Sequence, residues 1–181
     1  AVEAGIKISG NCSRRNALKS LNIYLRGNTY GDGDIDYKLF PNRDFKKYKR
    51  LRLRNSGQDF KHTMLRDGTN QQMLADVTDV EYQSYRPTLV YINGEYFGIQ
   101  NFRDLYGDEY FDGLFEVAEE DLDLIKNPRI YTDIKKGSDV HYQELYDYVL
   151  ANDLSDPSKF DYFKSQFDIE NFLDYWISMI Y

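Results

Sequence analysis

The Asn93-Gly94 dipeptide constrains the fold more than any other feature, because it predicts a β-hairpin. Apolar, β-branched and aromatic residues flank it on both sides, between Arg86 and Asp104. Both central residues of a type I′ turn need a positive φ, which Asn and Gly tolerate best. With a two-residue loop, the predicted cross-strand pairs are Ile92 with Glu95, Tyr91 with Tyr96, and Val90 with Phe97. We therefore expect two antiparallel strands closed by this turn.

Alternation along this hairpin predicts apolar side chains on both of its faces. One face carries Val90, Ile92, Phe97 and Ile99, and the other carries Leu89, Tyr91 and Tyr96. Apolar groups on both faces are typical of strands that are covered on both sides. We therefore expect the hairpin to be a central element of the fold.

Length and composition indicate a folded, acidic protein. At 181 residues the chain is long enough for one domain, or for one domain and part of another. Hydrophobic residues make up 41% and aromatic residues 16%, which excludes a disordered chain. The net charge of -7 argues against general nucleic-acid binding, because that function needs a basic domain.

The charges are unevenly distributed along the chain. Residues 43–66 contain nine Lys or Arg and only two acidic residues, Asp44 and Asp59. Residues 104–123 contain nine Asp or Glu and no Lys or Arg. We therefore expect a positive region and a negative region, each suited to a charged partner.

Cysteine and hydropathy exclude several kinds of site. Cys12 is the only cysteine, so an internal disulfide and a cysteine-based zinc site are both excluded. No apolar run reaches the length of a membrane span, so no transmembrane segment is predicted. His62 and His141 lack the spacing of metal ligands, and we interpret them as solvated side chains.

A run of alternating aspartates at positions 32, 34 and 36 suggests calcium binding. The calcium loop needs Gly at its sixth position and Glu at its twelfth, where this chain has Tyr37 and Arg43. We interpret the run as a turn, and no metal site is predicted in this chain.

Shorter strand patterns precede the hairpin, at residues 5–9, 21–26, 36–40 and 49–54. The first two are joined by a polar loop, residues 10–20, and we interpret them as a second hairpin. In the last pattern Leu51 and Leu53 point inward, and Arg50, Arg52 and Arg54 line the opposite face. Residues 60–77 are predicted to form a helix with an imperfect apolar stripe, which Gly68 weakens.

Two groups of basic residues could contact phosphate. The loop of residues 10–20 contains Gly10, Ser13, Arg14, Arg15 and Lys19, which offer backbone donors and cations. The alternative is a solvated basic loop, because exposed Lys and Arg are the norm. The arginine row of residues 50–54 is either a phosphate-facing surface or the solvent face of a half-buried strand.

After Asp104 the pattern changes to helices. They are predicted at residues 107–114, 138–150, 157–167 and 169–181, with caps from Ser138 or Asp139, from Asp156 and from Asp168. The last helix is strongly apolar and reaches Tyr181 without a stop signal. We therefore expect the chain to be part of a longer domain.

Several motifs follow one another in a defined order over nearly the whole chain. They are Gly10-Asn11-x-Ser13-Arg14 with Lys19-Ser20, Leu53-Arg54-Asn55 with Asp59, Met64-Leu65-Arg66-Asp67, Tyr85-Arg86-Pro87, the hairpin that ends at Gly98, Asn101-Phe102-Arg103-Asp104, and Asp168-x-x-Asn171-Phe172-Leu173-Asp174-Tyr175-Trp176. In this order the motifs resemble the spore-coat protein H (CotH) kinase-like family.

The resemblance implies an α+β, atypical protein-kinase-like fold. Residues 1–104 would form an antiparallel small-lobe sheet with one helix, and residues 105–181 would begin a helical lobe that is truncated here. The family resemblance also implies a phosphotransferase that uses ATP and Mg²⁺ to phosphorylate Ser or Thr of a surface or coat protein. It further implies a location in the cell envelope or coat, or outside the cell.

Phosphoryl transfer needs cations near the phosphates and carboxylates for the metal. By their place in the resemblance, Arg14 and Lys19 are the candidates for phosphate contact. Arg54 is expected to form an orienting ion pair with Asp67 or Asp59. The predicted cofactor-binding residues are therefore Arg14, Lys19, Arg54 and Asp67.

The chain also departs from the family pattern. The catalytic and metal-binding aspartates of the family follow the last helix, beyond residue 181, so we expect no catalytic or metal residue here and no activity of this fragment alone. Asp104 stands where the family usually has Glu, and Leu18 and Leu21 replace Lys and Tyr. The rival hypothesis is a non-catalytic surface module of the same fold that binds a protein or a glycan.

Overall fold

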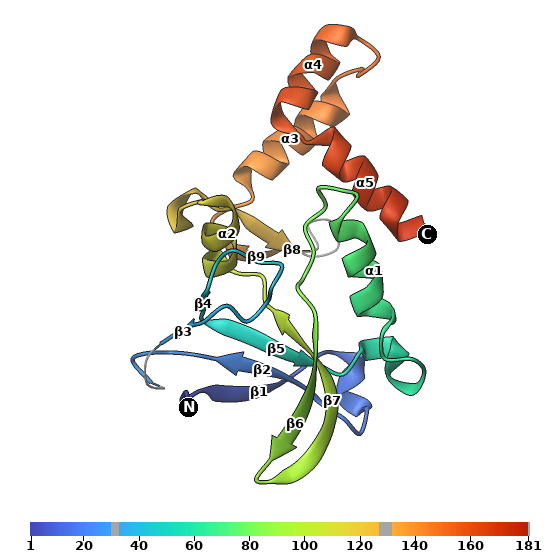
Figure 1. Ribbon diagram of the computed structural model, residues 1–181. Helices are drawn as coiled ribbons and strands as arrows, with labels where there is room; N and C mark the ends of the chain where they lie inside the picture. Colours follow the sequence, from blue (N-terminus) through green and yellow to red (C-terminus); the bar gives the residue numbers. More distant parts are fainter. Residues whose placement is uncertain (30–32, 127–131, 181) are drawn as a thin grey trace. The chain divides into compact units, whose positions relative to one another are not determined.

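The computed structural model describes residues 1–29, 33–126 and 132–180, apart from the side chains at positions 108, 109, 112 and 119. The chain divides into two compact units (Figure 1). Unit 1 contains Ala1–Val77 and Glu81–Val117, and unit 2 contains Thr78–Val80 and Ala118–Tyr181. The division into a small lobe and a helical lobe at residue 104 stays a prediction.

Unit 1 is built on a five-stranded antiparallel sheet with the strand order β1-β2-β5-β7-β6. Its strands are β1 (Gly5–Ser9), β2 (Ser20–Tyr24), β5 (Arg50–Arg54), β6 (Arg86–Ile92) and β7 (Glu95–Asp104). Helix α1 (Arg66–Ala75) lies between β5 and β6 in the chain. An antiparallel sheet combined with helices confirms the α+β prediction.

Five short elements complete unit 1. They are η1 (Cys12–Arg15), β3 (Ile35–Asp36), β4 (Lys47–Tyr48), η2 (Gly57–Lys61) and α2 (Asp108–Phe115). The strand predicted over residues 36–40 is wrong, because β3 ends at Asp36 and the chain then carries Phe40 into the core. The short helix predicted near residues 107–114 is confirmed by α2.

The register gives the sheet one apolar and one polar face. On the apolar face Leu21 pairs with Leu53, and Ile23 pairs with Leu51. Leu51 and Leu53 are 1% and 9% exposed, which confirms the alternation predicted for this strand. On the opposite face, Lys7, Asn22, Arg52 and Arg103 form one row across β1, β2, β5 and β7.

The core of unit 1 covers the apolar face of the sheet. Phe40, Tyr48 and Leu51 are buried together, and partly buried residues pack around them: Ile23, Ile35, Leu39, Phe45 and Phe102. Burying one such side chain stabilises the fold by roughly 1.5–3 kcal/mol. The core therefore fixes β2, β5 and β7, which also carry the polar row on their other face.

The turn of the β6–β7 hairpin forms as predicted. Asn93 and Gly94 have φ values of 53° and 83°, as a type I′ turn requires. The pairs Ile92–Glu95 and Tyr91–Tyr96 are confirmed. The predicted third pair is wrong, because a β-bulge makes Val90 pair with Gly98.

The predicted position of this hairpin in the fold is also wrong. β6 is an edge strand, and Leu89, Tyr91 and Tyr96 are 61%, 60% and 58% exposed. Simple alternation predicted Ile99 and Leu89 on opposite faces of the hairpin. Because of the bulge, Ile99 pairs with Leu89, and the two side chains share one face. The hairpin is thus the open edge of the sheet and is not covered on both sides.

The helix predicted over residues 60–77 is shorter than expected. Ser56 and Met64 have positive φ values of 64° and 60°, which interrupt a helical path before Arg66. The Asp59 carboxylate closes this turn, since it accepts the Thr63 hydroxyl at 2.7 Å and the Arg66 backbone N–H at 3.1 Å. Asp59 therefore supplies the cap that α1 lacks from its own N-cap residue.

Unit 2 begins with short elements and continues with three helices. They are η3 (Glu119–Asp121), β8 (Leu124–Lys126), β9 (Asp133–Lys136), α3 (Val140–Ala151), α4 (Pro157–Gln166) and α5 (Ile169–Ile180). The three helices confirm the predicted positions, whereas the β8–β9 pair was not predicted. The cap predicted for α3 is wrong, because its N-cap residue Asp139 makes no capping hydrogen bond through its side chain. Asp156 and Asp168 cap α4 and α5 through the backbone N–H groups of Ser158 and Asn171.

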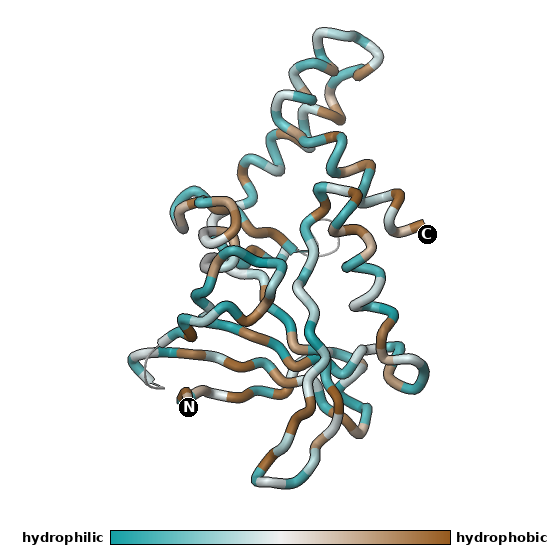
Figure 2. Tube along the Cα trace, in the orientation of Figure 1, coloured by the Kyte–Doolittle hydropathy of each residue, from teal (hydrophilic) through white to brown (hydrophobic). Residues whose placement is uncertain are grey.

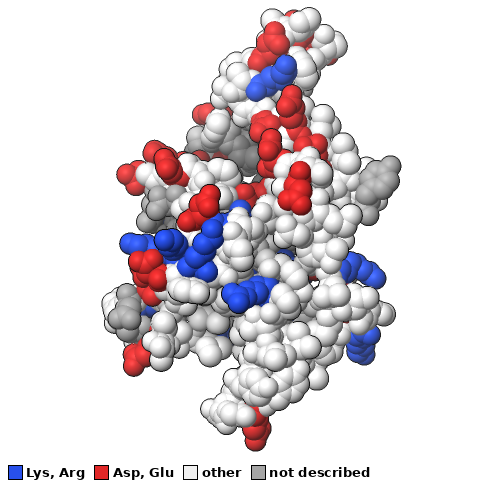
Figure 3. Space-filling view, in the orientation of Figure 1, with Lys and Arg blue, Asp and Glu red and all other residues white. Residues whose placement is uncertain are grey.

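Apolar residues are concentrated on α5, as Figure 2 shows. In the part of the chain that the structure describes, no helix combines the length and the apolar character that crossing a bilayer requires. Figure 3 shows that the visible Lys and Arg side chains gather mostly over unit 1, whereas acidic side chains dominate the visible part of unit 2. The predicted separation between residues 43–66 and residues 104–123 is a different one, because residues 104–117 belong to unit 1 as well, and it stays a prediction.

Candidate functional site

The polar face of the sheet concentrates arginines at the centre of unit 1. Arg52 and Arg54 point to this face from β5, and Arg103 points to it from β7. Arg52 lies directly opposite Arg103, and Arg54 lies opposite Asn101. Like charges directly opposite each other destabilise a sheet, so the fold carries a cost at this place.

Arg54 is held by the first turn of α1. Its Nε donates to Asp67 Oδ2 at 2.6 Å, and Gln71 Nε2 donates to the other carboxylate oxygen at 3.3 Å. The side chains of Arg54 and Asp67 are 34% and 27% exposed, so the pair borders solvent. Only Nε of Arg54 is engaged by Asp67, which leaves its terminal nitrogens for another anion.

Arg103 shares the same carboxylate from a fully buried position. Its Nη2 lies 3.1 Å from Asp67 Oδ2, and its side chain is 0% exposed. None of its three guanidinium nitrogens has a hydrogen-bond partner among the residues described. The Tyr85 ring lies 5.7 Å from its Cζ, and burial, opposed by Asp67, lowers the pKa of Arg103.

Arg52 has a neutral partner. Its Nε donates to Asn22 Oδ1 at 2.8 Å, and Asn22 in turn donates to the Tyr24 hydroxyl at 3.1 Å. Burial and the neighbouring Arg54 lower the pKa of Arg52. In the described part of the chain, Arg54 and Arg103 thus share one carboxylate, Asp67, whereas Arg52 lies beside them on Asn22.

Asn55 ties the loop between β1 and β2 to the end of β5. This side chain is 0% exposed, accepts the Ser20 hydroxyl at 2.8 Å and donates to the Leu18 carbonyl at 2.6 Å. Its backbone N–H donates to Ser20 Oγ at 3.0 Å. Asn16 adds a bond of 3.4 Å to the Gly57 carbonyl. The loop is therefore fixed next to Arg54.

Gly57 borders Arg54 on the loop side. A Cβ built on Gly57 would lie 3.2 Å from Arg54 Nη2, and the φ of Gly57 is 59°. A side chain here would both strain the backbone and crowd the guanidinium. Gly57 therefore keeps the space into which the terminal nitrogens of Arg54 extend.

The two loop residues predicted to contact phosphate lie near each other. Arg14 is exposed in η1, and Lys19 Nζ donates to the Arg14 carbonyl at 2.8 Å. Gly10 has a φ of 100°, and a Cβ there would collide with the Ser13 hydroxyl. The ammonium of Lys19 is thus partly used to close the loop, whereas the Arg14 side chain extends into solvent.

A second buried arginine network lies at the same end of β7, on the opposite face of the sheet. Arg43 is 4% exposed and donates to Glu81 at 2.7 Å, to Ser84 Oγ at 2.9 Å and to the Tyr110 hydroxyl at 2.6 Å. It also contacts the Tyr82 carbonyl. Asp104 lies 3.5 Å from Arg43 and accepts the Ser84 backbone N–H at 2.9 Å. This network joins β7 to the segment that precedes β6.

Burial controls the ionisation of this second network. It raises the pKa of Asp104, against the opposing effects of Ser84 and Arg43. It also raises the pKa of Tyr48 to about 12. Burial alone would lower the pKa of Arg43, but Tyr110, Glu81 and Asp104 together raise it. Arg43 therefore stays charged, and Asp104 holds its proton to a higher pH than an exposed aspartate.

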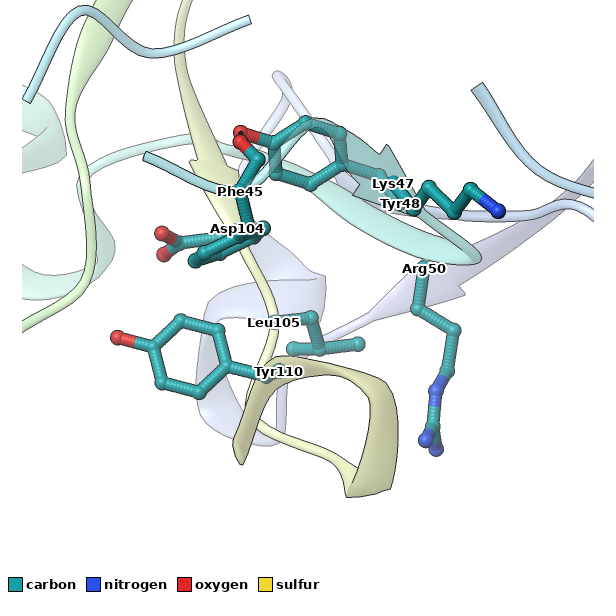
Figure 4. Close-up of a pocket in the computed structure, with 7 residues that line it drawn as sticks. All are labelled: Phe45, Lys47, Tyr48, Arg50, Asp104, Leu105 and Tyr110. Carbon is teal, nitrogen blue, oxygen red and sulfur yellow. Dashed lines mark hydrogen bonds between the residues drawn. The ribbon is translucent and has the colours of Figure 1, made fainter. Parts of the chain in front are cut away.

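A small cavity adjoins the second network. It is lined by Phe45, Lys47, Tyr48, Arg50, Asp104, Leu105 and Tyr110. Figure 4 shows that the carboxylate of Asp104 and the hydroxyl of Tyr110 point to the same side, whereas the charged ends of Lys47 and Arg50 point away from them. Its volume of about 10 Å³ suits one water molecule and is far too small for a nucleotide.

A comparison with protein-family models decides the relationship of this chain. The model described as CotH kinase protein matches residues 6–181. The chain belongs to the CotH kinase family. Searches of curated proteins and of solved structures gave no significant match.

The family gives the fold a kinase-like character, and the structure shows how the predicted residues of this CotH domain are placed. Arg54 and Asp67 form an ion pair. Asp59, the alternative partner of Arg54, is instead used by Thr63 and the start of α1. Arg14 and Lys19 lie together on the loop that Asn55 holds beside Arg54. Whether these residues bind a nucleotide stays a prediction.

Sequence reasoning missed two residues of this CotH site, Arg103 and Asn55. Both stand in the family-like motifs, but neither motif indicates a buried polar side chain. Ile99, Asn101 and Arg103 alternate along β7 and therefore share one face of the sheet. With the bulge at Gly98 known, this alternation would have placed Arg103 on that face. Asn55 accepts the nearby Gly57 backbone N–H, but the partners that tie it to the loop lie 35 to 42 residues away in sequence, where no local pattern indicates them.

The CotH family implies ATP and Mg²⁺, and the residues fit these groups differently. Two guanidiniums share the Asp67 carboxylate, and the terminal nitrogens of the solvent-bordering Arg54 suit the phosphates of a nucleotide. Among the residues that the structure describes, no group of three His, Cys, Asp or Glu could hold a metal ion. This part of the chain thus fits the anion and provides no complete metal site.

Proposed function

We propose that this chain forms the nucleotide-positioning part of a CotH-type phosphotransferase that uses ATP and Mg²⁺. The observation that carries the proposal is the ion pair between Arg54 and Asp67, at 2.6 Å, beside the loop that connects β1 and β2. The strand, the helix and the loop belong to unit 1, so the arrangement is internal to one compact body.

The pair has the place of the orienting ion pair in protein kinases. In those enzymes a lysine on the third strand pairs with a glutamate of the helix that follows, and both must be in position for phosphoryl transfer. Here Arg54 ends β5, the third strand in the sheet order, and Asp67 lies in α1, the helix after it. This correspondence of strand, helix and charge supports a kinase-like role for the pair.

Charge supports the same role. Because Asp67 is shared by two guanidiniums, the polar face keeps positive charge next to the loop. Hydrogen bonds from a guanidinium to phosphate are among the strong, charge-assisted kind. The residues of this chain would hold and orient the phosphates, whereas Mg²⁺ would neutralise charge on the transferred group when bound.

The reaction needs carboxylates that this part of the chain does not combine into a metal site. We propose that the catalytic and metal-binding aspartates come from a segment that follows residue 181 in the complete domain. The acceptor we propose is a Ser or Thr of a surface or coat protein, with action in the envelope, in the coat or outside the cell. These finer statements rest on the family and its name.

Titration calorimetry with Mg-ATP tests the nucleotide role. We expect residues 1–181 to bind Mg-ATP and the Arg54→Met variant to bind it about 10- to 100-fold more weakly, which corresponds to one lost charge-assisted hydrogen bond. Arg26→Met is the matched control, because Arg26 is exposed and contacts only the Tyr24 ring in the described structure. Equal affinities of the wild type and Arg54→Met would contradict the proposal.

The loop is tested by Lys19→Ala in the same experiment. Because Lys19 Nζ already binds the Arg14 carbonyl, we expect a smaller loss of affinity, about threefold. Unchanged binding would remove Lys19 from the site.

Turnover gives an independent test of the missing carboxylates. We expect residues 1–181 to transfer no phosphate from Mg-ATP to a Ser-rich peptide, measured with radiolabelled ATP. Incorporation of label by this fragment would show that a catalytic carboxylate lies within it.

A second candidate function is a non-catalytic module of the same fold. The observation that favours it is the exposed tyrosine pair Tyr91 and Tyr96, whose rings lie 5.6 Å apart beside exposed Leu89. Exposed tyrosines are typical of surfaces that bind proteins or glycans. Paired aspartates after residue 181 would favour the enzyme, and other residues in their place would favour the module.

A further inference from the structure

Arg103 occupies a position that packing alone does not explain. Its side chain is fully buried, yet Nε, Nη1 and Nη2 find no hydrogen-bond partner among the described residues. It also lies directly opposite Arg52, a partly buried arginine. Burying unpaired donors and opposing like charges both destabilise a fold. Such a cost at a candidate site suggests a role beyond stability.

Arg103 contacts the first turn of α1 and the Tyr85 ring that packs against it. Its Nη2 lies 3.1 Å from Asp67 Oδ2, the same oxygen that accepts Arg54 Nε. Its Cζ lies over the ring of Tyr85, and a Cβ on Gly68 would come within 2.8 Å of that ring. Arg103 is therefore enclosed by the first turn of α1 and the residue that packs against it.

Sharing Asp67 changes the electrostatics of Arg54. A carboxylate that pairs with a single guanidinium neutralises the charge of that guanidinium. Asp67 pairs with two guanidiniums, so its single negative charge cannot neutralise both. Arg103 is too deeply buried to touch a ligand, so its effect on one must pass through Asp67 and Arg54. The low polarity around it makes this electrostatic effect stronger than it would be in water.

We infer that Arg103 is a positioning residue of the nucleotide site: it fixes Asp67 at the start of α1 and keeps Arg54 from being neutralised. The inference rests on the proposed nucleotide-binding function. It assigns to the buried guanidinium the task of keeping positive charge on Arg54 for the phosphates. A merely structural arginine would stabilise unit 1 without altering affinity for a nucleotide.

A double-mutant cycle on Mg-ATP affinity tests this inference. The variants are Arg103→Gln, Asp67→Asn and the combination of both, compared by titration calorimetry with residues 1–181 of the wild type. Arg103→Gln removes the charge and keeps hydrogen-bonding groups near Asp67. We expect it to weaken Mg-ATP binding about tenfold in the wild-type background and less than about twofold in the Asp67→Asn background.

Arg103→Lys separates charge from packing. Because lysine keeps the positive charge, we expect its affinity for Mg-ATP to lie within about fivefold of the wild type, a partial rescue. If Arg103→Gln does not fold, as judged by circular dichroism, Arg103→Lys is used in the same cycle. Its loss of affinity, about two- to fivefold, should then disappear when Asp67 is replaced by Asn.

The outcomes distinguish the proposed nucleotide binding from the positioning role of Arg103. If the wild type does not bind Mg-ATP, both the proposed function and this inference are wrong. If the wild type binds and Arg103→Gln binds equally well, only the inference is wrong. Equal losses in the presence and absence of the Asp67 carboxylate would also overturn it, because Arg103 would then not act through Asp67.

Discussion

Two adjacent residues of β7 belong to two buried arginine networks with opposite properties. Arg103 and Asp104 point to opposite faces of the sheet, because neighbouring residues of a strand alternate. Arg103 joins Arg54 and Asp67, and Asp104 joins Arg43, Glu81 and Tyr110. One strand therefore carries both networks. Their difference indicates which network belongs to the candidate binding site and which one stabilises the fold.

The networks differ in how completely their donors are satisfied. Arg43 donates to Ser84, Glu81 and Tyr110, and two carboxylates surround it. Arg103 has one shared carboxylate and no hydrogen-bond partner in the described part of the chain. A network with engaged donors rigidifies a fold, whereas excess positive charge next to the solvent-bordering Arg54 suits an incoming anion. The Arg43 network is a structural joint, and the Arg103 network is the candidate site.

The largest expected difference between the networks concerns stability. Arg43→Gln leaves Glu81 and Asp104 near each other without a cation, and we expect it to lower the free energy of unfolding by about 3–5 kcal/mol. Arg103→Gln leaves Asp67 paired with Arg54, and we expect a loss of only about 1–2 kcal/mol. Urea denaturation followed by circular dichroism measures both values.

The comparison would fail if the two glutamine variants lost equal stability. It would also fail if Arg43→Gln, once folded, weakened Mg-ATP binding as much as Arg103→Gln does. Either result would mean that the two networks share one role.

A medium effect is expected at Gly57, which borders only the candidate site. In Gly57→Ala the new Cβ lies 3.2 Å from Arg54 Nη2, so we expect about three- to tenfold weaker Mg-ATP binding in calorimetry. Gly94→Ala is the matched control, since Gly94 also has a positive φ, 83°, but no heavy atom lies within 4 Å of its Cβ position. Both variants should lose about 1 kcal/mol of stability from backbone strain.

Equal effects of Gly57→Ala and Gly94→Ala on nucleotide affinity would mean that Arg54 does not contact the phosphates. The stability measurements then show whether the shared backbone strain alone accounts for the result.

The smallest expected effect is a pH dependence confined to the second network. Burial raises the pKa of Asp104, so the folded protein holds this proton to a higher pH than the unfolded chain. The contribution of Asp104 to the free energy of unfolding therefore falls as pH rises from about 4 through the raised pKa. Asp104→Asn cannot ionise, so the stability advantage of the wild type over this variant should shrink between pH 4 and pH 8.

Urea denaturation at several pH values measures this difference. Arg43 and Tyr48 titrate above this range, and Glu81 is present in both proteins, so the comparison isolates Asp104. A constant difference between the wild type and Asp104→Asn, or one that grows with pH, would contradict the assignment.

Local patterns predicted much of the fold. Alternation located β1, β2 and β5, the Asn-Gly turn located the β6–β7 hairpin, and side-chain caps located α4 and α5. The bulge at Gly98 escaped prediction, and the close approach of Leu18, 2.9 Å from a Cβ built on Gly98, is a tertiary contact that no local pattern reveals. The turn closed by Asp59 escaped for a similar reason, since its Met64 adopts a positive φ that side-chain pattern does not reveal.

The candidate site was only partly predictable. The resemblance indicated Arg54 with Asp67 or Asp59, and the structure pairs Arg54 with Asp67. Periodicity placed Arg54 on the polar face, but no local rule indicates that Arg103 is fully buried beside the same carboxylate. That position depends on strand order and on the packing of Tyr85 against Gly68, which are tertiary properties.

The short, glycine-containing helix α1 implies an order of folding events. It has 10 residues, and isolated helices shorter than about 12–15 residues are marginal in water. Gly68 weakens it further by roughly 1 kcal/mol relative to alanine, yet only glycine admits the Tyr85 ring. We therefore expect helix α1 to form on the sheet after β5 and β7 have paired. Protection of its backbone amides from hydrogen exchange should follow that of the sheet, so the carboxylate of Asp67 is among the last groups to reach its place.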